Sequence, residues 1–266
     1  MHIMIRAAVT GASGRMGKLI ISNIVAFDGM QLSAAFDLVN IGKDAGETAQ
    51  VGNLGVAISD VKDMEKVLKG SATDVLIDFT IADATVVNAP RAASAGVNLV
   101  IGTTGLSDEQ KHIIETAVFK HAVAGIISPN FSVGVNVFFK ILAEASKYLG
   151  DFDIEVIEAH HNKKKDAPSG TAIKAADVIS ATLGGKEYVY GRQGLAPRSK
   201  EIGIHAVRGG DIAGDHTVLF AGDGERIEIK HQAHSRQSFA SGAVKAAAWV
   251  CNAGPGMYTM EDILGL

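Results

Sequence analysis

The chain has 266 residues, a formal net charge of −4 and a hydrophobic fraction of 47%, as expected of a globular protein with a sizeable core. The mild acidity excludes a general nucleic-acid binder, and no apolar run approaches the roughly 18 residues of a membrane-spanning helix. Because Cys251 is the only cysteine, an internal disulfide is excluded, and we expect a cytoplasmic protein without nucleic-acid or membrane partners.

In the first half of the chain, short apolar runs alternate with helical patterns, which is typical of βαβ units around a parallel sheet. The runs predict strands over residues 3–9, 31–36, 75–80, 98–105 and 124–129. Helices are predicted from about Met16, over 82–96, and from a cap at Ser107 to about Lys120. Segment 39–60 is less regular and predicts a loop with only a short strand after it.

The pattern changes after residue 131. It predicts a long apolar helix over 133–150 that ends at a glycine cap, Gly150, followed by a strand over 153–161 and a helix over 169–183. Runs 216–222 and 225–233 flank a glycine turn, and the second run alternates strictly, which indicates an antiparallel hairpin with one polar face. The last predicted helix covers 238–250.

These elements predict an α/β protein of two domains. Residues 1–130 form a doubly wound parallel sheet of Rossmann type, and residues 131–239 form an α+β domain with a mixed, largely antiparallel sheet. We expect segment 240–266 to pack back on the first domain.

The sequence VTGASGRMGKL places Gly11, Gly14 and Gly17 between the first strand and the first helix. Glycines at such a turn let backbone N–H groups approach a pyrophosphate, with Ala12, Ser13, Arg15 and Met16 completing the loop. The spacing is G-x-x-G-x-x-G and not G-x-G-x-x-G, so a turn without a ligand and a mononucleotide or flavin site stay open as alternatives.

Asp37 ends the second strand twenty residues after Gly17, where an acidic side chain accepts hydrogen bonds from an adenosine ribose. Leu38 follows it, so no arginine stands there to hold a 2′-phosphate, which favours NADH over NADPH. Arg15 or Lys43 could still accommodate the phosphate.

Three further strand ends carry small, hydroxylated, amide or aromatic residues, which suit contacts to a nicotinamide. They are Phe79-Thr80, the GTTG sequence that includes Gly102, Thr103 and Thr104, and Ser128, Pro129, Asn130 and Phe131. Because ligands of open α/β sheets bind at the carboxyl ends of the strands, we expect these residues to face the cofactor.

The sequence EAHHNKKKDAPSGTA, residues 158–172, concentrates titratable groups ahead of a helix start. A solvated charge run, a metal site, a phosphate site and a proton-transfer site are the alternatives. Neighbours on a strand point to opposite faces, so His160 and His161 do not predict a metal site. Ser169-Gly170-Thr171 and Lys164 instead predict a carboxylate site, at which His160 exchanges protons.

This signature resembles that of the dihydrodipicolinate reductase family. The resemblance covers nearly the whole chain, including VTGASGRMG at the start, DFT at 78–80, VIGTTGL at 100–106, NFSVGVN at 130–136 and the segment 208–236. It implies a homotetramer, and it implies NAD(P)H-dependent reduction of 4-hydroxy-tetrahydrodipicolinate, or the dihydrodipicolinate formed from it, in lysine biosynthesis.

The resemblance also implies residue roles. His160 and Lys164 match the family's proton-transfer residues, and His161, Gly170 and Thr171 match those that hold the substrate carboxylates. The dinucleotide contacts match Gly11 to Met16, Asp37, Gly102 to Thr104 and Ser128 to Phe131. We interpret Lys163 and Lys165 as flanking residues.

Two other functions remain as alternatives to a two-domain reductase. A semialdehyde dehydrogenase of similar build needs a catalytic cysteine, and Cys251 stands in the last predicted helix. A dinucleotide-sensing regulator would have no use for the histidine–lysine cluster. For the reductase, we expect the domains to close about hinges near residues 130 and 236–240.

Overall fold

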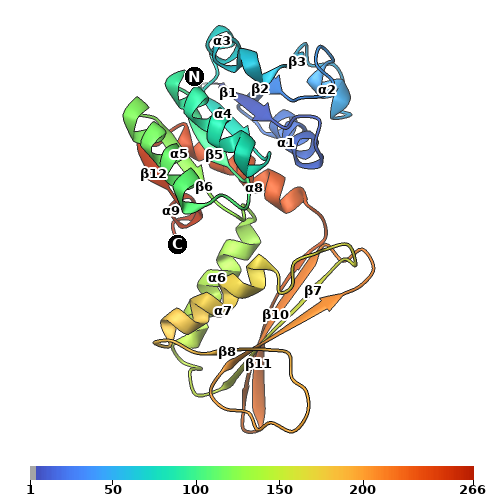
Figure 1. Cartoon of the computed structure of the whole chain (residues 1–266), viewed down its shortest axis with the longest axis vertical. Helices are drawn as coiled ribbons and strands as arrows, with labels where there is room; N and C mark the ends of the chain where they lie inside the picture. The colour runs from blue at the N-terminus through green and yellow to red at the C-terminus, as the bar shows by residue number, and fades with distance from the viewer. Residues whose placement is uncertain (1–3) are drawn as a thin grey trace. The chain divides into compact units, whose positions relative to one another are not determined.

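The computed structural model describes residues 4–266, and the chain forms two units, shown in Figure 1. The first unit combines the described residues up to Ser132 with Gln237–Leu266, and the second is Val133–Arg236. Ile3, which the sequence assigns to the first strand, lies outside the described residues. No helix within residues 4–266 is both long and apolar enough to cross a membrane.

A parallel sheet of seven strands, counted within the described residues, forms the centre of the first unit. The strand order is β12-β6-β5-β4-β1-β2-β3, and every neighbouring pair is parallel, as the βαβ pattern predicted. The strands are β1 Ile5–Thr10, β2 Met30–Phe36, β3 Ile58–Ser59, β4 Val75–Asp78, β5 Asn98–Ile101, β6 Ala124–Ile127 and β12 Gly256–Tyr258. Their carboxyl ends therefore share one edge.

Helices cover both faces of this sheet. They are α1 Arg15–Ala26, α2 Ala45–Thr48, α3 Met64–Gly70, α4 Ala82–Ser94, α5 Asp108–His121, α8 Gln237–Val250 and α9 Met260–Leu264. One core lies beneath α1 and α8 and includes Ile20 and Val244, while the other lies beneath α3, α4 and α5 and includes Leu68 and Ile114. Ser107 caps α5 as predicted, because its Oγ accepts a hydrogen bond from Gln110 N at 3.1 Å.

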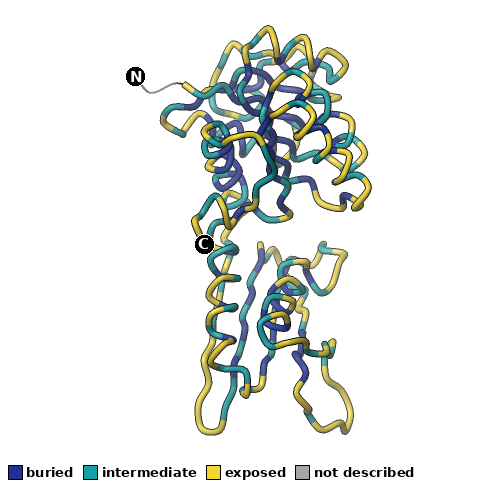
Figure 2. Tube along the Cα trace, turned by 90° about the vertical axis from the view of Figure 1, so that its left-hand side faces the viewer, coloured by how far each residue is buried: buried dark blue, intermediate teal, exposed yellow. Residues whose placement is uncertain are grey.

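The second unit is a mixed five-stranded sheet, counted within the described residues, with α6 Val133–Ser146 and α7 Gly170–Thr182 on one face. The strand order is β11-β10-β7-β9-β8. The strands are β7 Asp153–His160, β8 Tyr188–Tyr190, β9 Ile202–Arg208, β10 Gly214–Gly222 and β11 Glu225–Ala233. The β10–β11 hairpin is antiparallel as predicted, whereas β9 lies parallel to β7 and to β8. In Figure 2 the buried stretches run through the interior of each unit, and exposed stretches lie mainly along its outside.

The end of α6 differs from its prediction. The helix ends at Ser146, and Gly150 does not adopt the left-handed conformation of a glycine cap. A Cβ added at Gly150 would stand 2.8 Å from Leu183 Cδ2. The close neighbour of Gly150 is therefore a side-chain methyl group of Leu183, and the φ angle at this position does not require a glycine.

The irregular segment 39–60 contains a one-turn helix, α2, in addition to β3. Asp44 caps this turn and organises the loop, because its carboxylate accepts hydrogen bonds from the backbone N–H groups of Glu47, Leu54 and Val56. Within the described residues, six further elements were not predicted from the sequence: the 3-10 helix η1 Val61–Asp63, α3, α9, β8, β9 and β12.

Candidate active site

The cofactor residues predicted in the first unit gather at the carboxyl edge of its sheet. The glycine loop follows β1, Asp37 follows β2, Phe79 follows β4, Gly102 to Thr104 follow β5, and Ser128 to Phe131 follow β6. The strand order reverses between β1 and β4, and the carboxyl ends of the strands at such a reversal are where open α/β sheets bind dinucleotides.

The glycine loop has the shape that a pyrophosphate needs. Gly11 has a φ of +70°, and a Cβ added at Gly17 would stand 2.1 Å from the Gly11 carbonyl oxygen, so neither position accepts a larger residue. Gly14 occupies the N-cap of α1 and has no side chain with which to cover the helix start. The residues present therefore fit a dinucleotide whose phosphates lie against the positive end of α1.

Asp37 is held at the rim of this loop. Its Oδ2 accepts a hydrogen bond from Ser13 N at 2.8 Å, and its Oδ1 accepts one from Leu38 N at 2.7 Å. Asn40 Nδ2 donates to Ser13 Oγ at 3.2 Å, which ties the loop after β2 to the glycine loop. The Asp37 carboxylate thus lies beside the glycine loop, where the ribose hydroxyl of a bound dinucleotide would reach it.

An aromatic and hydroxyl cluster connects the remaining strand ends. The rings of Phe79 and Phe131 lie 5.7 Å apart, and a Cβ added at Gly102 would stand 2.1 Å from the Phe79 ring. The buried Asp78 Oδ1 accepts hydrogen bonds from the hydroxyls of Thr80 at 2.7 Å and Thr103 at 3.0 Å. This cluster fixes the strand-end loops relative to one another.

In the second unit, the buried face of β7 ends in a carboxylate–imidazole pair. Side chains of a strand alternate between faces, so Glu158 and His160 continue the face on which Ile154 and Val156 enter the core. His160 Nδ1 lies 2.6 Å from Glu158 Oε2, and the Glu158 side chain is 0% exposed. The proton-transfer histidine predicted from the sequence therefore stands beside a buried acid.

Arg208, the last residue of β9, binds both oxygens of Glu158. Its Nη1 lies 2.8 Å from Oε2 and its Nη2 lies 2.8 Å from Oε1, which also accepts Ser169 N at 2.9 Å. Burial raises the pKa of Glu158, but the hydrogen bonds from Arg208, His160 and Ser169 N outweigh burial and lower that pKa overall. Glu158 is therefore an anion at neutral pH.

His216, on the neighbouring strand β10, contacts Ser169 and His160, the two residues that bind Glu158 alongside Arg208. Its Nε2 lies 3.0 Å from Ser169 Oγ, and its ring packs edge to face against His160. Burial, reinforced by the adjacent His160, lowers the pKa of His216 to about 4. This imidazole is therefore neutral at physiological pH and is not a proton donor there.

The lysines of the motif differ in their surroundings. Lys164 is partly buried and forms an ion pair with Asp166 at 2.9 Å, while Lys163 and Lys165 are exposed. The Asp166 carbonyl accepts a hydrogen bond from Arg208 at 2.7 Å, so the lysine turn is connected to the Glu158 cluster.

The start of α7 completes the site in the second unit. Ser169 is its N-cap, with Oγ accepting Ala172 N at 3.2 Å, and Gly170 is exposed with open space where a Cβ would stand. Thr171 lies in the first turn, and His161, partly buried, follows His160 at the end of β7. The helix start and its positive dipole end therefore lie one residue from the N–H group that binds Glu158.

Glu158, Arg208 and His216 were given no function by the predictions from the sequence. A local signal existed for Glu158, because a strand places residues two apart on one face, and it stands two before His160. Arg208 and His216 lie about fifty residues further along the chain, and only the tertiary fold brings them to this cluster.

Family models match both halves of the chain. The model described as dihydrodipicolinate reductase, N-terminus, matches residues 5–131, and the model described as dihydrodipicolinate reductase, C-terminus, matches residues 134–264. The 4-hydroxy-tetrahydrodipicolinate reductase of Methanococcoides burtonii is 74% identical over 98% of this chain and 100% of that protein. The reductase of the same name from Methanocaldococcus jannaschii is 52% identical over 99% of this chain and 98% of that protein.

Solved structures agree with the sequence comparison. Dipicolinate-bound dihydrodipicolinate reductase from Paenisporosarcina sp. TG-14 has a TM-score of 0.80 and 28% identity, covering 97% of this chain and 98% of that chain. An amine dehydrogenase from Mycobacterium smegmatis, at 17% identity and a TM-score of 0.64, shares the fold. The chain belongs to the dihydrodipicolinate reductase family of NAD(P)H-dependent oxidoreductases.

Proposed function

We propose that this protein uses NADH in preference to NADPH to reduce 4-hydroxy-tetrahydrodipicolinate, or the dihydrodipicolinate formed from it by loss of water, with His160 and Lys164 transferring protons. One observation carries the assignment of these residues. The end of β7 and the start of α7 place His160, Lys164 and Gly170 around one hydrogen-bonded cluster. A dicarboxylate ring requires such a combination of anion-binding and proton-transfer groups.

When bound, the dinucleotide supplies the hydride. The chain binds its phosphates at the glycine loop and α1, orients its ribose through Asp37, and presents Gly102 to Thr104 and Ser128 to Phe131 to the nicotinamide. Asp37 and the neighbouring Leu38 support the preference for NADH, because a carboxylate at this position repels a 2′-phosphate.

The substrate carboxylates bind at the start of α7, with His161, Gly170 and Thr171 as their contacts. The bound dipicolinate of the Paenisporosarcina relative supports a pyridine-type dicarboxylate as the ligand class. Reduction adds one hydride and one proton, and His160 with Lys164 provides the proton at the substrate. Because hydride transfer needs both ligands within van der Waals reach, we propose hinges at residues 132–133 and 236–237, where the chain passes between the units.

Neither alternative function is favoured by the structure. Burial, with the charge of Asp74 nearby, raises the pKa of Cys251 to about 12, so this thiol is not the nucleophile of a semialdehyde dehydrogenase. Asp74 and Cys251 also line a cavity with Ile5 and Asn98, at the amino-terminal edge of the sheet and away from the glycine loop. A dinucleotide-sensing regulator catalyses no reaction, so it would not need the hydrogen-bonded cluster of Glu158, His160 and Arg208.

We also propose a homotetramer in the cytoplasm. The face of the second sheet opposite α6 and α7 carries two exposed apolar residues, Ile157 on β7 and Val207 on β9, and a second copy of the chain would cover them. The molar mass in solution, measured by light scattering at several protein concentrations, tests the tetramer. A monomer at all concentrations would contradict it.

The test of the proposed function is direct. Purified protein is mixed with NADH and enzymatically generated substrate, and the loss of NADH absorbance is followed. We expect oxidation by the wild type. We expect His160→Gln to bind NADH with the wild-type Kd, measured by fluorescence without substrate, while kcat falls on the order of 100-fold or more. Failure of the wild type to oxidise NADH would remove the proposal.

A further inference from the structure

The hydrogen bonds around Glu158 fix which nitrogen of His160 carries a proton. An ionised carboxylate can only accept hydrogen bonds, so Nδ1 of His160 must be the donor in its contact with Glu158. The second ring nitrogen, Nε2, is then the nitrogen whose proton can be gained or lost without breaking this contact.

Arg208 keeps Glu158 in that accepting state. The guanidinium binds both carboxylate oxygens in a two-pronged arrangement, and this geometry strongly favours the ionised acid. Glu158 therefore orients the imidazole without competing for the proton that the imidazole transfers.

The surroundings of Nε2 support its role. A Cβ added at Gly214 would stand 3.0 Å from His160 Nε2, so a glycine at the start of β10 keeps a side chain away from this atom. The other carboxylate oxygen of Glu158, Oε1, accepts a hydrogen bond from Ser169 N at the N-cap of α7. One buried side chain thus sets the orientation of the imidazole and the position of the helix start.

We propose that Glu158, clamped by Arg208, is the positioning residue that holds His160 with its proton on Nδ1 and presents Nε2 to the substrate. The inference rests on the proposed function for its kinetic consequence. The structural part of the proposal is that Nδ1 of His160 carries the proton, and this can be tested without any substrate.

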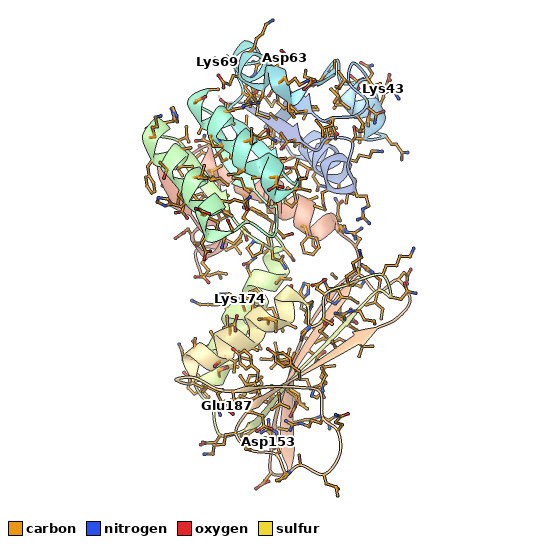
Figure 3. The ribbon with its side chains drawn as sticks, viewed as in Figure 1. Lys43, Asp63, Lys69, Asp153, Lys174 and Glu187 are labelled. Atoms are coloured by element: carbon orange, nitrogen blue, oxygen red, sulfur yellow. The ribbon has the colours of Figure 1, made fainter. Side chains whose placement is uncertain are left out.

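The chain offers a matched control on the same strand. Glu155 lies two residues after Asp153, which Figure 3 labels at the start of β7, and its side chain is on the opposite face from Glu158. Glu155 also contacts a histidine, His205 at 2.7 Å, and an arginine, Arg192 at 2.8 Å. It therefore has the same chemistry as Glu158 at the other end of the strand, away from His160.

The first measurement is the ¹⁵N NMR spectrum of the imidazoles in the full-length protein without ligands, with His160→Gln used to assign the His160 signals. We expect the neutral ring to carry its proton on Nδ1 in the wild type. In Glu158→Gln the amide N–H donates to Nδ1, and we expect the proton to move to Nε2. A wild-type ring with its proton on Nε2 would overturn the proposal.

The second measurement compares turnover. We expect Glu158→Gln to lower kcat on the order of 100-fold or more, as for other histidines held in the wrong tautomer, with the KM for NADH unchanged within about twofold. Glu155→Gln should stay within about twofold of the wild type in both constants. Equal kcat values for the two variants would contradict the inference, while absence of turnover in the wild type would contradict the proposed function alone.

A second variant covers the case in which Glu158→Gln does not fold. Arg208→Lys keeps the positive charge but cannot bind both carboxylate oxygens in the two-pronged geometry. We expect a loss of kcat of about tenfold, equivalent to one charged hydrogen bond, together with a shifted Nδ1 resonance of His160. A wild-type kcat with an unshifted resonance in this variant would refute the clamp.

Discussion

The rings of His160 and His216 lie edge to face with centroids 5.1 Å apart, yet the two imidazoles have different partners and different chemistry. His160 faces the Glu158 carboxylate, whereas His216 faces the Ser169 hydroxyl. Burial lowers the pKa of His216 to about 4, so this imidazole is neutral at physiological pH, whereas His160 is the histidine to which we assign proton transfer in the proposed function.

This arrangement makes stability depend on pH. The folded-state pKa of His216 is about 4, against 6.5 for the ordinary group, so between these values the unfolded chain binds a proton that the folded chain does not. Stability is then lost as the pH falls, by about 2 kcal/mol from this group between about pH 7 and about pH 5. Urea unfolding of the wild type and of His216→Gln at both pH values measures the free energy of unfolding. An equal decrease in both proteins would contradict the lowered pKa of His216 as its cause.

Of the three adjacent lysines, Lys164 alone should matter for turnover. Its side chain is 21% exposed and ion-paired with Asp166, while its neighbours extend into solvent. We expect Lys164→Ala to lower kcat/KM for the substrate on the order of 100-fold, because the proposed proton donor is lost. Lys163→Ala and Lys165→Ala serve as controls and should change it by about twofold at most. A comparable loss in either control would show that the cationic cluster acts as a whole.

Asp37 should set the ratio of cofactor use. We expect Asp37→Ala to lower kcat/KM with NADH by about tenfold or more, the effect of one lost charged hydrogen bond to the ribose. The value with NADPH should fall less or rise, because the repelling carboxylate is gone. Side-by-side kinetics with both dinucleotides give the ratio, and an unchanged ratio would show that Asp37 does not discriminate between them.

The glycine loop allows a test with a matched pair. Gly17→Ala places a Cβ 2.1 Å from a backbone oxygen, so the loop must distort, and we expect NADH affinity to fall and stability to drop by about 2 kcal/mol or more. Gly70→Ala, in α3, meets nothing within 4 Å and should leave NADH affinity unchanged. Fluorescence titration and thermal unfolding of both variants provide the comparison. Wild-type affinity in Gly17→Ala would contradict the role of the loop.

Sequence patterns predicted the parallel unit well because each of its main strands is a buried apolar run next to a helical period. The strand β9 was missed because IGIHAVR mixes glycine, histidine and arginine with its apolar residues, and its pairing with β7 is non-local. Without β9 the sheet could not be recognised as half parallel.

The same limit applies to the site. The helix start at Ser169 and the titratable residues of 158–172 could be predicted because they are contiguous. The role of Glu158 depends on Arg208, fifty residues later, and no local pattern indicates that they meet. Gly150 shows the converse case, in which a familiar local signal does not correspond to a left-handed helix cap in the structure.

The return of α8 to the first unit has a consequence for the order in which the chain can fold during synthesis. The core beneath α1 and α8 includes Ala243, Val244 and Val250, so it stays open until these residues have left the ribosome. The inserted unit, Val133–Arg236, is continuous in sequence and can close its own core earlier. The inserted unit is thus expected to fold before the unit that contains the glycine loop.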